Sequence, residues 1–319
     1  MFKGSIVAII TPFKNGKVDE KKLKELVEFQ IKNGTSGIVP CGTTGESPTL
    51  SHEEHHRVVE ICVQSAAGRV PIIAGTGSNS TDEAVALTKH AAKAGASAAL
   101  VVTPYYNKPT SKGLYLHFKA VAECADIPII LYNIAGRTAR NMEPALIAKL
   151  AQDCKNIIGV KEASGSLEQM QIIKNICPKD FILLSGDDIL TLPILAIGGV
   201  GAISVIANII PADTAKVIQL FNAGKLKEAQ ALHYKILPLA QAMFIETNPI
   251  PVKTAAGLLG LCSPDLRLPL CSMEEENLKK LKTALKNYGL LKGTNDDQTR
   301  DQRLPRPNGK QNYASGFAR

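Results

Sequence analysis

The chain has 319 residues, 45% of them hydrophobic, and a formal net charge of +8 at pH 7. No stretch approaches the roughly 18 to 20 apolar residues of a membrane-spanning helix, so the composition predicts a soluble globular protein without a membrane partner. The basic residues are scattered and the aromatic residues are few, seven tyrosines and eight phenylalanines, so the charge favours small anionic substrates over nucleic acid.

The first apolar run, residues 5–10, ends at Thr11-Pro12 and is too short for the apolar region of a signal peptide. The seven cysteines are odd in number, widely spaced and contain no C-x-x-C pair. We therefore expect a cytoplasmic protein with reduced thiols.

Short β-rich runs alternate with longer segments of helical apolar spacing, which is typical of βα units around a parallel sheet. The predicted strands are residues 4–10, 37–40, 71–74, 98–102, 128–132, 156–161, 181–185 and 201–205. The predicted helices between them are residues 20–33, 53–66, 81–94, 112–124, 143–152, 167–176 and 189–197. Eight such strands favour a (β/α)8 TIM barrel of the α/β class over an open doubly wound sheet, which usually has fewer strands.

Four more helical patterns follow the last strand, at residues 212–223, 226–244, 251–261 and 273–288. We therefore expect a catalytic barrel over 1–223 and a C-terminal helical extension over 224–292. Residues 293–319 are rich in Asn, Asp, Gln, Arg, Pro and Gly and have too few apolar side chains to order themselves. A disordered tail without catalytic function is predicted there.

Lys161 closes the apolar run Asn156-Ile157-Ile158-Gly159-Val160, a strand that should be buried on both faces. An amine in apolar surroundings tends toward its neutral form, which attacks carbonyl carbons and makes a Schiff base the first chemistry to consider. Taken alone, the residue also fits an ordinary lysine that leaves the strand for solvent and pairs with Glu162, since most lysines are exposed.

The carboxyl ends of the strands, where the chemistry of a barrel gathers, are unusually polar. They read Thr11-Pro12, Gly42-Thr43-Thr44-Gly45-Glu46, Gly75-Thr76-Gly77, Thr103-Pro104-Tyr105-Tyr106, Tyr132-Asn133, Lys161-Glu162, Gly186-Asp187-Asp188 and Ile203-Ser204. The glycines of the second of these turns let its backbone approach a small anion such as a carboxylate. Tyr106 and Tyr132 can relay protons or simply pack at the barrel rim. Arg137, after a flexible Ala135-Gly136 pair, can bind a second carboxylate.

Two familiar motifs are present only in part. His52-Glu53-Glu54-His55-His56 satisfies H-E-x-x-H, but Ser51 and Glu54 form a capping-box pattern that puts His52 in the first turn of an outer helix, with no evident third zinc ligand. Gly75-Thr76-Gly77 starts a dinucleotide fingerprint but has Ser80 where the third glycine belongs. We predict neither a metal nor a nucleotide cofactor.

Taken in order, the motifs resemble the dihydrodipicolinate synthase family of the pyruvate-dependent class I aldolases, the superfamily that includes N-acetylneuraminate lyase. The resemblance covers about residues 1–292 and rests on Gly42-Thr43-Thr44-Gly45-Glu46-Ser47, Val102-Thr103-Pro104-Tyr105-Tyr106-Asn107, Tyr132-Asn133, Gly136-Arg137-Thr138, Gly159-Val160-Lys161-Glu162-Ala163, Leu184-Ser185-Gly186-Asp187-Asp188 and Asn248-Pro249-Ile250-Pro251-Val252-Lys253. The tail after Gly293 has no counterpart in the family pattern.

The resemblance implies a lyase of the diaminopimelate route to lysine that needs no metal or organic cofactor. Lys161 would form an imine with pyruvate, and the derived enamine would attack L-aspartate 4-semialdehyde to give 4-hydroxytetrahydrodipicolinate. The resemblance also implies a homotetramer, built as a dimer of dimers.

The same resemblance implies roles for the remaining site residues. Thr43, Tyr132 and Tyr106 would relay protons, with Tyr106 reaching into the site of a neighbouring subunit. Thr44 would bind the carboxylate of pyruvate and Arg137 that of the semialdehyde, while the backbones of Gly186 and Ile203 would line the site.

Relatives inhibited by L-lysine bind it at a subunit interface, which implies feedback inhibition here. Glu83 suits the ammonium groups of lysine, and the polar residues suit its carboxylate. The matching positions are Ser47, His52, His55, Asn79, Glu83 and Tyr105.

Three positions depart from the family pattern. Ala135 stands where proline is usual and Ala139 replaces a frequent glycine, both in the loop of Arg137, so the second substrate is affected more than the imine step. Pro48, where a small residue is common, bears on the lysine site.

Two other functions stay open. A related aldolase would cleave a sugar acid such as N-acetylneuraminate or a 2-keto-3-deoxy acid, but Gly136-Arg137-Thr138 suits a short carboxylated aldehyde better than a polyol. A non-catalytic protein that binds lysine or a keto acid would not need a buried amine.

Overall fold

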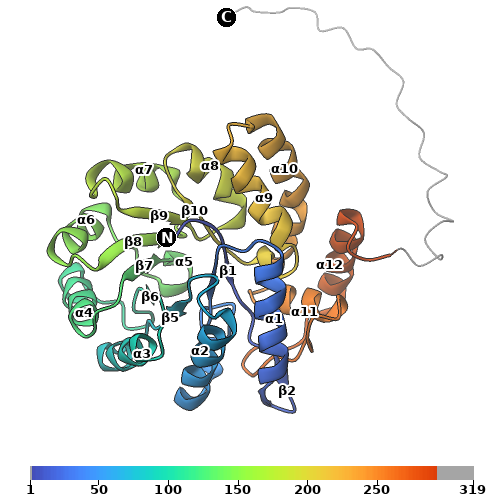
Figure 1. The fold of residues 1–319 in the computed structure, drawn as a ribbon, viewed down its shortest axis with the longest axis horizontal. Coiled ribbons are helices and arrows are strands. Elements are labelled where there is room, and N and C mark those ends of the chain that lie inside the picture. Colours follow the sequence, from blue (N-terminus) through green and yellow to red (C-terminus); the bar gives the residue numbers. More distant parts are fainter. Residues whose placement is uncertain (1, 293–319) are drawn as a thin grey trace, which may run out of the picture.

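The computed structural model describes residues 2–292, and at its centre eight parallel strands form a barrel (Figure 1). The predicted tail over 293–319 lies outside the described residues. The barrel strands are β1 (Gly4–Ala8), β4 (Gly37–Val39), β5 (Ile73–Gly75), β6 (Ala98–Val102), β7 (Ile129–Asn133), β8 (Ile157–Glu162), β9 (Ile182–Ser185) and β10 (Gly201–Ser204).

The strands follow the order β4-β1-β10-β9-β8-β7-β6-β5. A parallel bridge between Ile38 of β4 and Ile72, which directly precedes β5, joins the two ends of this order and closes the sheet on itself. The predicted TIM barrel is therefore confirmed, as are its eight strands.

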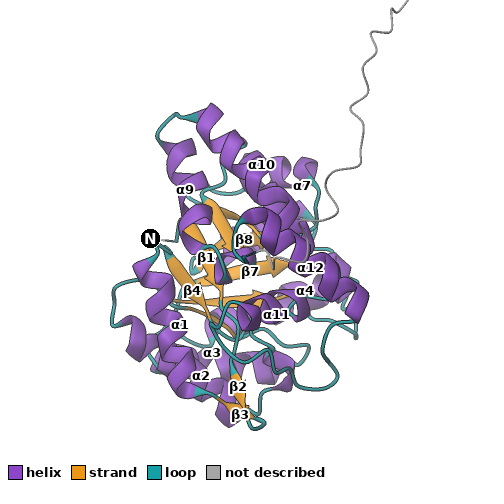
Figure 2. Ribbon diagram, turned by 90° about the vertical axis from the view of Figure 1, so that its right-hand side faces the viewer, coloured by secondary structure: helices purple, strands orange, loops and turns teal. Residues whose placement is uncertain are grey.

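Helices surround the strands, as two perpendicular views show (Figures 1 and 2). They are α1 (Glu20–Lys32), α2 (His52–Ala66), α3 (Thr81–Lys93), α4 (Ser111–Glu123), α6 (Pro144–Asp153), α7 (Leu167–Ile176), α8 (Thr191–Ala196) and α9 (Pro211–Asn222). The C-terminal helices are α10 (Leu226–Ala242), α11 (Ile250–Leu258) and α12 (Glu275–Tyr288). Among the helices of the described residues, none is long and apolar enough to cross a membrane.

Several helices begin at a side chain that accepts a hydrogen bond from their first turn, which offsets the unpaired N–H groups there. Asp19, Ser51, Ser80, Thr110 and Ser166 act in this way. At α2 the Glu54 side chain also accepts from the backbone N–H of Ser51, so the predicted capping box is confirmed and His52 lies in the first turn.

The sequence patterns did not predict the shortest helices and strands. Strands β2 (Phe13–Lys14) and β3 (Lys17–Val18) form a hairpin whose turn residues Asn15 and Gly16 both have positive φ, but two-residue strands show no periodicity. The Ala135-Gly136 pair expected to be flexible belongs to a short helix, α5 (Ala135–Thr138). The 3-10 helix Asp188–Leu190 occupies the predicted start of α8.

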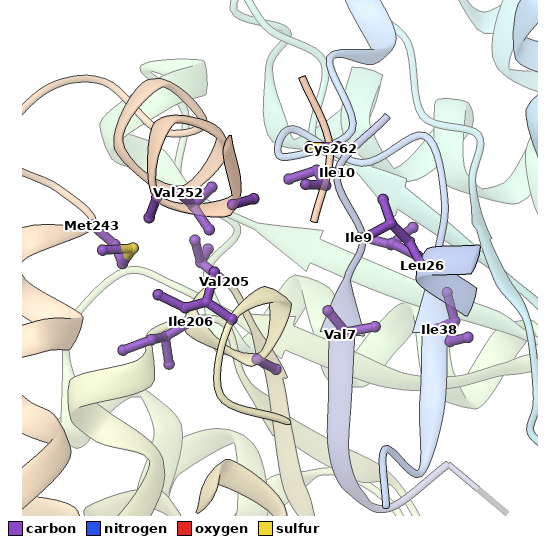
Figure 3. Packing of buried hydrophobic residues seen from close by; sticks show 14 of the residues in the cluster. Val7, Ile9, Ile10, Leu26, Ile38, Val205, Ile206, Met243, Val252 and Cys262 are labelled. Atoms are coloured by element: carbon purple, nitrogen blue, oxygen red, sulfur yellow. The ribbon is translucent and has the colours of Figure 1, made fainter. Parts of the chain in front are cut away.

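Side chains alternate between the inside and the outside of the barrel, as the period of two in a strand requires. Ile6 and Ala8 of β1 belong to the buried cluster that includes Tyr132 and Ile203, whereas Val7 packs in a second cluster with residues of α1. This second cluster also contains Val205, Met243 and Val252 (Figure 3), so the C-terminal segment packs directly onto the barrel.

Candidate active site

Lys161 ends inside the barrel beside Tyr132. The two residues are register partners on β8 and β7, and the amine Nζ lies 4.1 Å from the centre of the Tyr132 ring. Lys161 is 6% exposed, so the alternative of a lysine directed to solvent is wrong. Glu162 lies on the other face of the strand, fully buried, where it accepts hydrogen bonds from Asn133 and Ser164 rather than pairing with Lys161.

Gly186 makes room for the lysine side chain. A Cβ at this position would lie 3.0 Å from Cε of Lys161 and 2.6 Å from Cβ of Ala163, distances too short for a side chain without displacement. The Gly186 backbone lies at the same small cavity as Lys161, whose volume is about 40 Å³. The cavity lining also includes Thr43, Thr44, Tyr132, Arg137 and Asn248.

Ile203 lies in β10, with its side chain in the barrel-interior cluster that contains Tyr132. Its side chain is not part of the cavity lining, and the role expected of its backbone stays a prediction.

The Thr43-Thr44 turn is held by hydrogen bonds from two distant segments. Thr11 donates its hydroxyl to the carbonyl oxygen of Gly45 over 2.7 Å, and the Asn248 amide donates to Oγ1 of Thr44 over 3.1 Å. Because Oγ1 of Thr44 accepts from Asn248, its own proton is left to donate to a ligand in the cavity.

Arg137 lines this cavity from α5. One guanidinium nitrogen donates to the backbone oxygen of Asn248 over 3.1 Å, which leaves further N–H groups for a carboxylate. Helix α5 is followed by Ala139, which has a φ of 55° in the left-handed region that glycine adopts more easily. This is the position where the family pattern has a glycine.

A second, larger cavity of about 340 Å³ adjoins the first and shares Thr43, Tyr132 and Arg137 with it. Five of the six expected lysine-binding residues line this cavity, namely Ser47, His52, His55, Glu83 and Tyr105. Asn79 is not in the lining, and its backbone oxygen accepts a hydrogen bond from the Asn107 side chain.

The charges in the second cavity are well defined. Hydrogen bonds lower the pKa of Glu83, the one from Ser78 more than the one from His52, so the Glu83 carboxylate is ionised at neutral pH. Burial lowers the pKa of His55 to about 4, so this imidazole is neutral at pH 7. Its Nε2 must then carry the proton donated to the Gly75 oxygen 2.8 Å away, and Nδ1, which has no partner among the described residues, is an acceptor.

The histidines in the H-E-x-x-H segment each contact a different partner. His52 pairs with Glu83 at 2.7 Å, His55 with the Gly75 carbonyl, and His56 stacks on His90 with ring centres 3.7 Å apart. Within residues 2–292, no three side chains of metal-ligating type are grouped in a way that could hold a metal ion.

Tyr106 is not brought to Lys161 of its own chain. It is 90% exposed, has a φ of 70° and lines neither cavity. A bulky residue held in the left-handed region is a sparsely populated conformation that often marks a functional position.

Four residues near the site had no role in the sequence-based hypothesis: Thr11, Glu46, Asn248 and Lys253. Glu46, Asn248 and Lys253 lie within motifs that carry the family resemblance, and this position was the signal by which the sequence could have identified them. The contacts of Lys253 with Glu46 and of Asn248 with Thr44 join positions about 200 residues apart, and the contact of Thr11 with Gly45 spans 34 residues, so no local pattern reports these pairs.

Comparisons with known proteins agree with this geometry. The model of the Dihydrodipicolinate synthetase family matches residues 1–288. The chain is 62% identical to the 4-hydroxy-tetrahydrodipicolinate synthase of Endomicrobium trichonymphae over 292 residues, which covers 92% of this chain and 100% of that relative.

Solved structures give the same result. A dihydrodipicolinate synthase from Aquifex aeolicus superimposes with a TM-score of 0.89 and 51% identity, covering 91% of this chain and 99% of that one. DHDPS from Cyanidioschyzon merolae with lysine bound superimposes with a TM-score of 0.88 and 42% identity, again over 91% and 99% of the two chains.

Proposed function

Because the chain belongs to the dihydrodipicolinate synthetase family, we propose that it condenses pyruvate with L-aspartate 4-semialdehyde, the reaction of the 4-hydroxy-tetrahydrodipicolinate synthases. This family is the one that the strand-end motifs of the sequence resemble. Identities of 60 and 62% to two such synthases, over more than nine-tenths of the chain, make it a lyase of this kind.

The observation that carries the mechanism is the buried amine of Lys161 beside Tyr132, in space left open by Gly186. The neutral amine attacks the keto carbon of pyruvate, water leaves, and the imine loses a methyl proton to become an enamine. The enamine carbon then attacks the aldehyde carbon of the semialdehyde. Finally the amino group of that substrate displaces Lys161, which closes the ring of 4-hydroxytetrahydrodipicolinate and frees the enzyme.

The surrounding residues bind the substrates and move protons. Thr44 donates to the pyruvate carboxylate and Arg137 to the carboxylate of the semialdehyde. Tyr132 and Thr43 carry protons between the reacting oxygens and solvent.

Tyr106 completes the proton relay from a second copy of the chain. Its exposure and its left-handed backbone support this proposal, because the side chain projects away from its own barrel at a conformational cost. The assembly we propose is a homotetramer made of two such dimers. All seven cysteines carry free thiols, which suits the reducing cytoplasm.

L-Lysine would inhibit the enzyme at the larger cavity. The ionised Glu83 suits an ammonium group, and the acceptor Nδ1 of neutral His55 suits another N–H donor. A relative with lysine bound supports the proposal.

Borohydride trapping tests the mechanism. Reduction in the presence of pyruvate is expected to add pyruvate irreversibly to Lys161, as located by mass spectrometry of peptides. An unlabelled Lys161 would refute the imine. Turnover of sugar acids without turnover of aspartate semialdehyde would instead assign the chain to the related aldolases.

A further inference from the structure

We propose that the buried ion pair between Lys253 and Glu46 positions the Thr43-Thr44 turn for binding the keto-acid carboxylate. This inference rests on the proposed function and adds two positioning residues to it. Neither residue contacts the cavity around Lys161, so both act through the turn.

The pair is fully buried. Both side chains are 0% exposed, and Nζ of Lys253 lies 2.5 Å from Oε1 of Glu46 and 3.9 Å from the centre of the Phe13 ring. Two charges removed from water this completely depend on each other, because loss of either one leaves an uncompensated buried charge.

Glu46 lies where the turn ends and the next segment begins. Its backbone N–H donates to the Thr43 oxygen over 3.1 Å, and its own oxygen accepts from the backbone N–H of Thr49. Its φ of 55° is unusual for a residue with a side chain and is maintained by the contacts around it. Moving the Glu46 side chain would therefore move the backbone that carries Thr43 and Thr44.

The C-terminal segment supplies the partners of Glu46. The second carboxylate oxygen, Oε2, accepts the backbone N–H of Arg267 over 3.2 Å. The Arg267 guanidinium in turn binds Glu54 with two hydrogen bonds and the Thr49 oxygen with a third. Arg267 thus binds the segment that follows the turn at three residues, Glu46, Thr49 and Glu54.

The residues at the start of helix α11 also contact the turn at Thr44. Asn248, which precedes this helix, donates to Oγ1 of Thr44, while Lys253 lies one turn into the helix. The start of α11 therefore contacts the turn at Thr44 and at Glu46. Packing of the C-terminal helices determines where the carboxylate-binding hydroxyls lie.

Three variants test the proposal: Lys253→Met, Glu46→Gln and the double variant. Each single change leaves one charged or mismatched partner buried, so we expect KM for pyruvate to rise on the order of tenfold to a hundredfold, and the rate of borohydride trapping at low pyruvate to fall in parallel. The double variant buries two neutral groups of similar shape, and the oxygen of the new amide side chain can still accept from the Arg267 backbone. Its KM is expected within roughly threefold of wild type.

A matched control separates positioning from stability. Leu150→Ala removes a fully buried side chain of α6 from a hydrophobic cluster that contains no residue of α11 or α12, so it lowers the thermal midpoint while leaving KM for pyruvate unchanged. If Lys253→Met does not fold, Glu46→Gln alone carries the test, because it keeps a side chain of the same shape.

Unchanged KM for pyruvate in a folded single variant would overturn the proposal, as would a double variant that is worse than both single variants. Trapping of pyruvate on wild-type Lys161 is read separately, so failure of the imine mechanism is distinguished from failure of the positioning role.

Discussion

The amine of Lys161 lies 4.1 Å from the centre of the Tyr132 ring because the two residues are register partners on adjacent parallel strands. The barrel thus brings an amine and a phenol together without any loop. The ring and the hydroxyl of Tyr132 have separable roles, since the ring packs against the lysine side chain and the hydroxyl can transfer protons.

Tyr132→Phe tests this separation. The variant keeps the ring and removes the hydroxyl, so pyruvate should still be trapped on Lys161 by borohydride while kcat falls by about 10² to 10⁴. Steady-state kinetics and mass spectrometry measure the two quantities. Wild-type kcat in the variant would remove Tyr132 from the proton relay.

Gly186→Ala is expected to displace Lys161. The added Cβ would lie 3.0 Å from Cε of Lys161, so imine formation should slow by roughly a hundredfold as the amine moves off its position. Gly136→Ala is the matched control, because a Cβ there meets nothing within 4 Å. Equal trapping rates for both variants would contradict the proposed role of Gly186.

Ala139→Gly is expected to stabilise the protein. Ala139 has a φ of 55°, which costs a residue with a side chain roughly 1 to 2 kcal/mol, and glycine avoids most of this cost. The free energy of unfolding in urea should rise by about 1 kcal/mol. Ala135→Gly, at the first residue of α5 and without a positive φ, should change the free energy of unfolding in the opposite direction.

Stability should fall as the pH drops below 6.5, in part through His117. This residue is 5% exposed, and burial lowers its pKa to about 4, whereas the unfolded chain has the ordinary value near 6.5. Between these values the unfolded state binds more protons, so acid favours unfolding.

From pH 7 to pH 5 the share of His117 in this loss is about 2 kcal/mol. His117→Asn, which keeps an acceptor near Thr81, should remove that share when the free energies of unfolding at the two pH values are compared. His55 has a similar pKa and leaves a remaining slope in the variant. Identical slopes in wild type and variant would contradict the assignment.

Glu83→Gln is expected to weaken inhibition by L-lysine. Loss of a carboxylate partner for an ammonium group costs about 1.5 to 3 kcal/mol, so the inhibition constant should rise at least tenfold while KM for pyruvate stays the same. The double variant His55→Ala, Glu83→Ala should abolish inhibition. Glu25→Gln on α1 is the surface control, and an uninhibited wild-type enzyme would refute the proposal.

The sequence by itself determined the architecture and drew attention to Lys161. Alternation of apolar strands with helical patterns predicted eight βα units, and element boundaries deviated by only a few residues, as for residues 156–161 against Ile157–Glu162. Lys161 stood out because it ends a buried strand, but that pattern alone also fits an ordinary exposed lysine, and its catalytic role comes from the family resemblance and stays a prediction. These features depend on neighbours along the chain, whose spacing is visible in the residues themselves.

Only the tertiary structure decided what surrounds Lys161. Gly186 adjoins Lys161, Asn248 binds Thr44, and Lys253 meets Glu46 across 207 residues of sequence. The Ala135-Gly136 pair, which the sequence suggested was flexible, belongs to helix α5 in the structure. Pairing of β8 with β9 places Gly186 next to Lys161, and packing of α11 against the barrel produces the contacts of Asn248 and Lys253. That packing is stabilised by buried surface shared between distant segments, which leaves no periodic signal in either one.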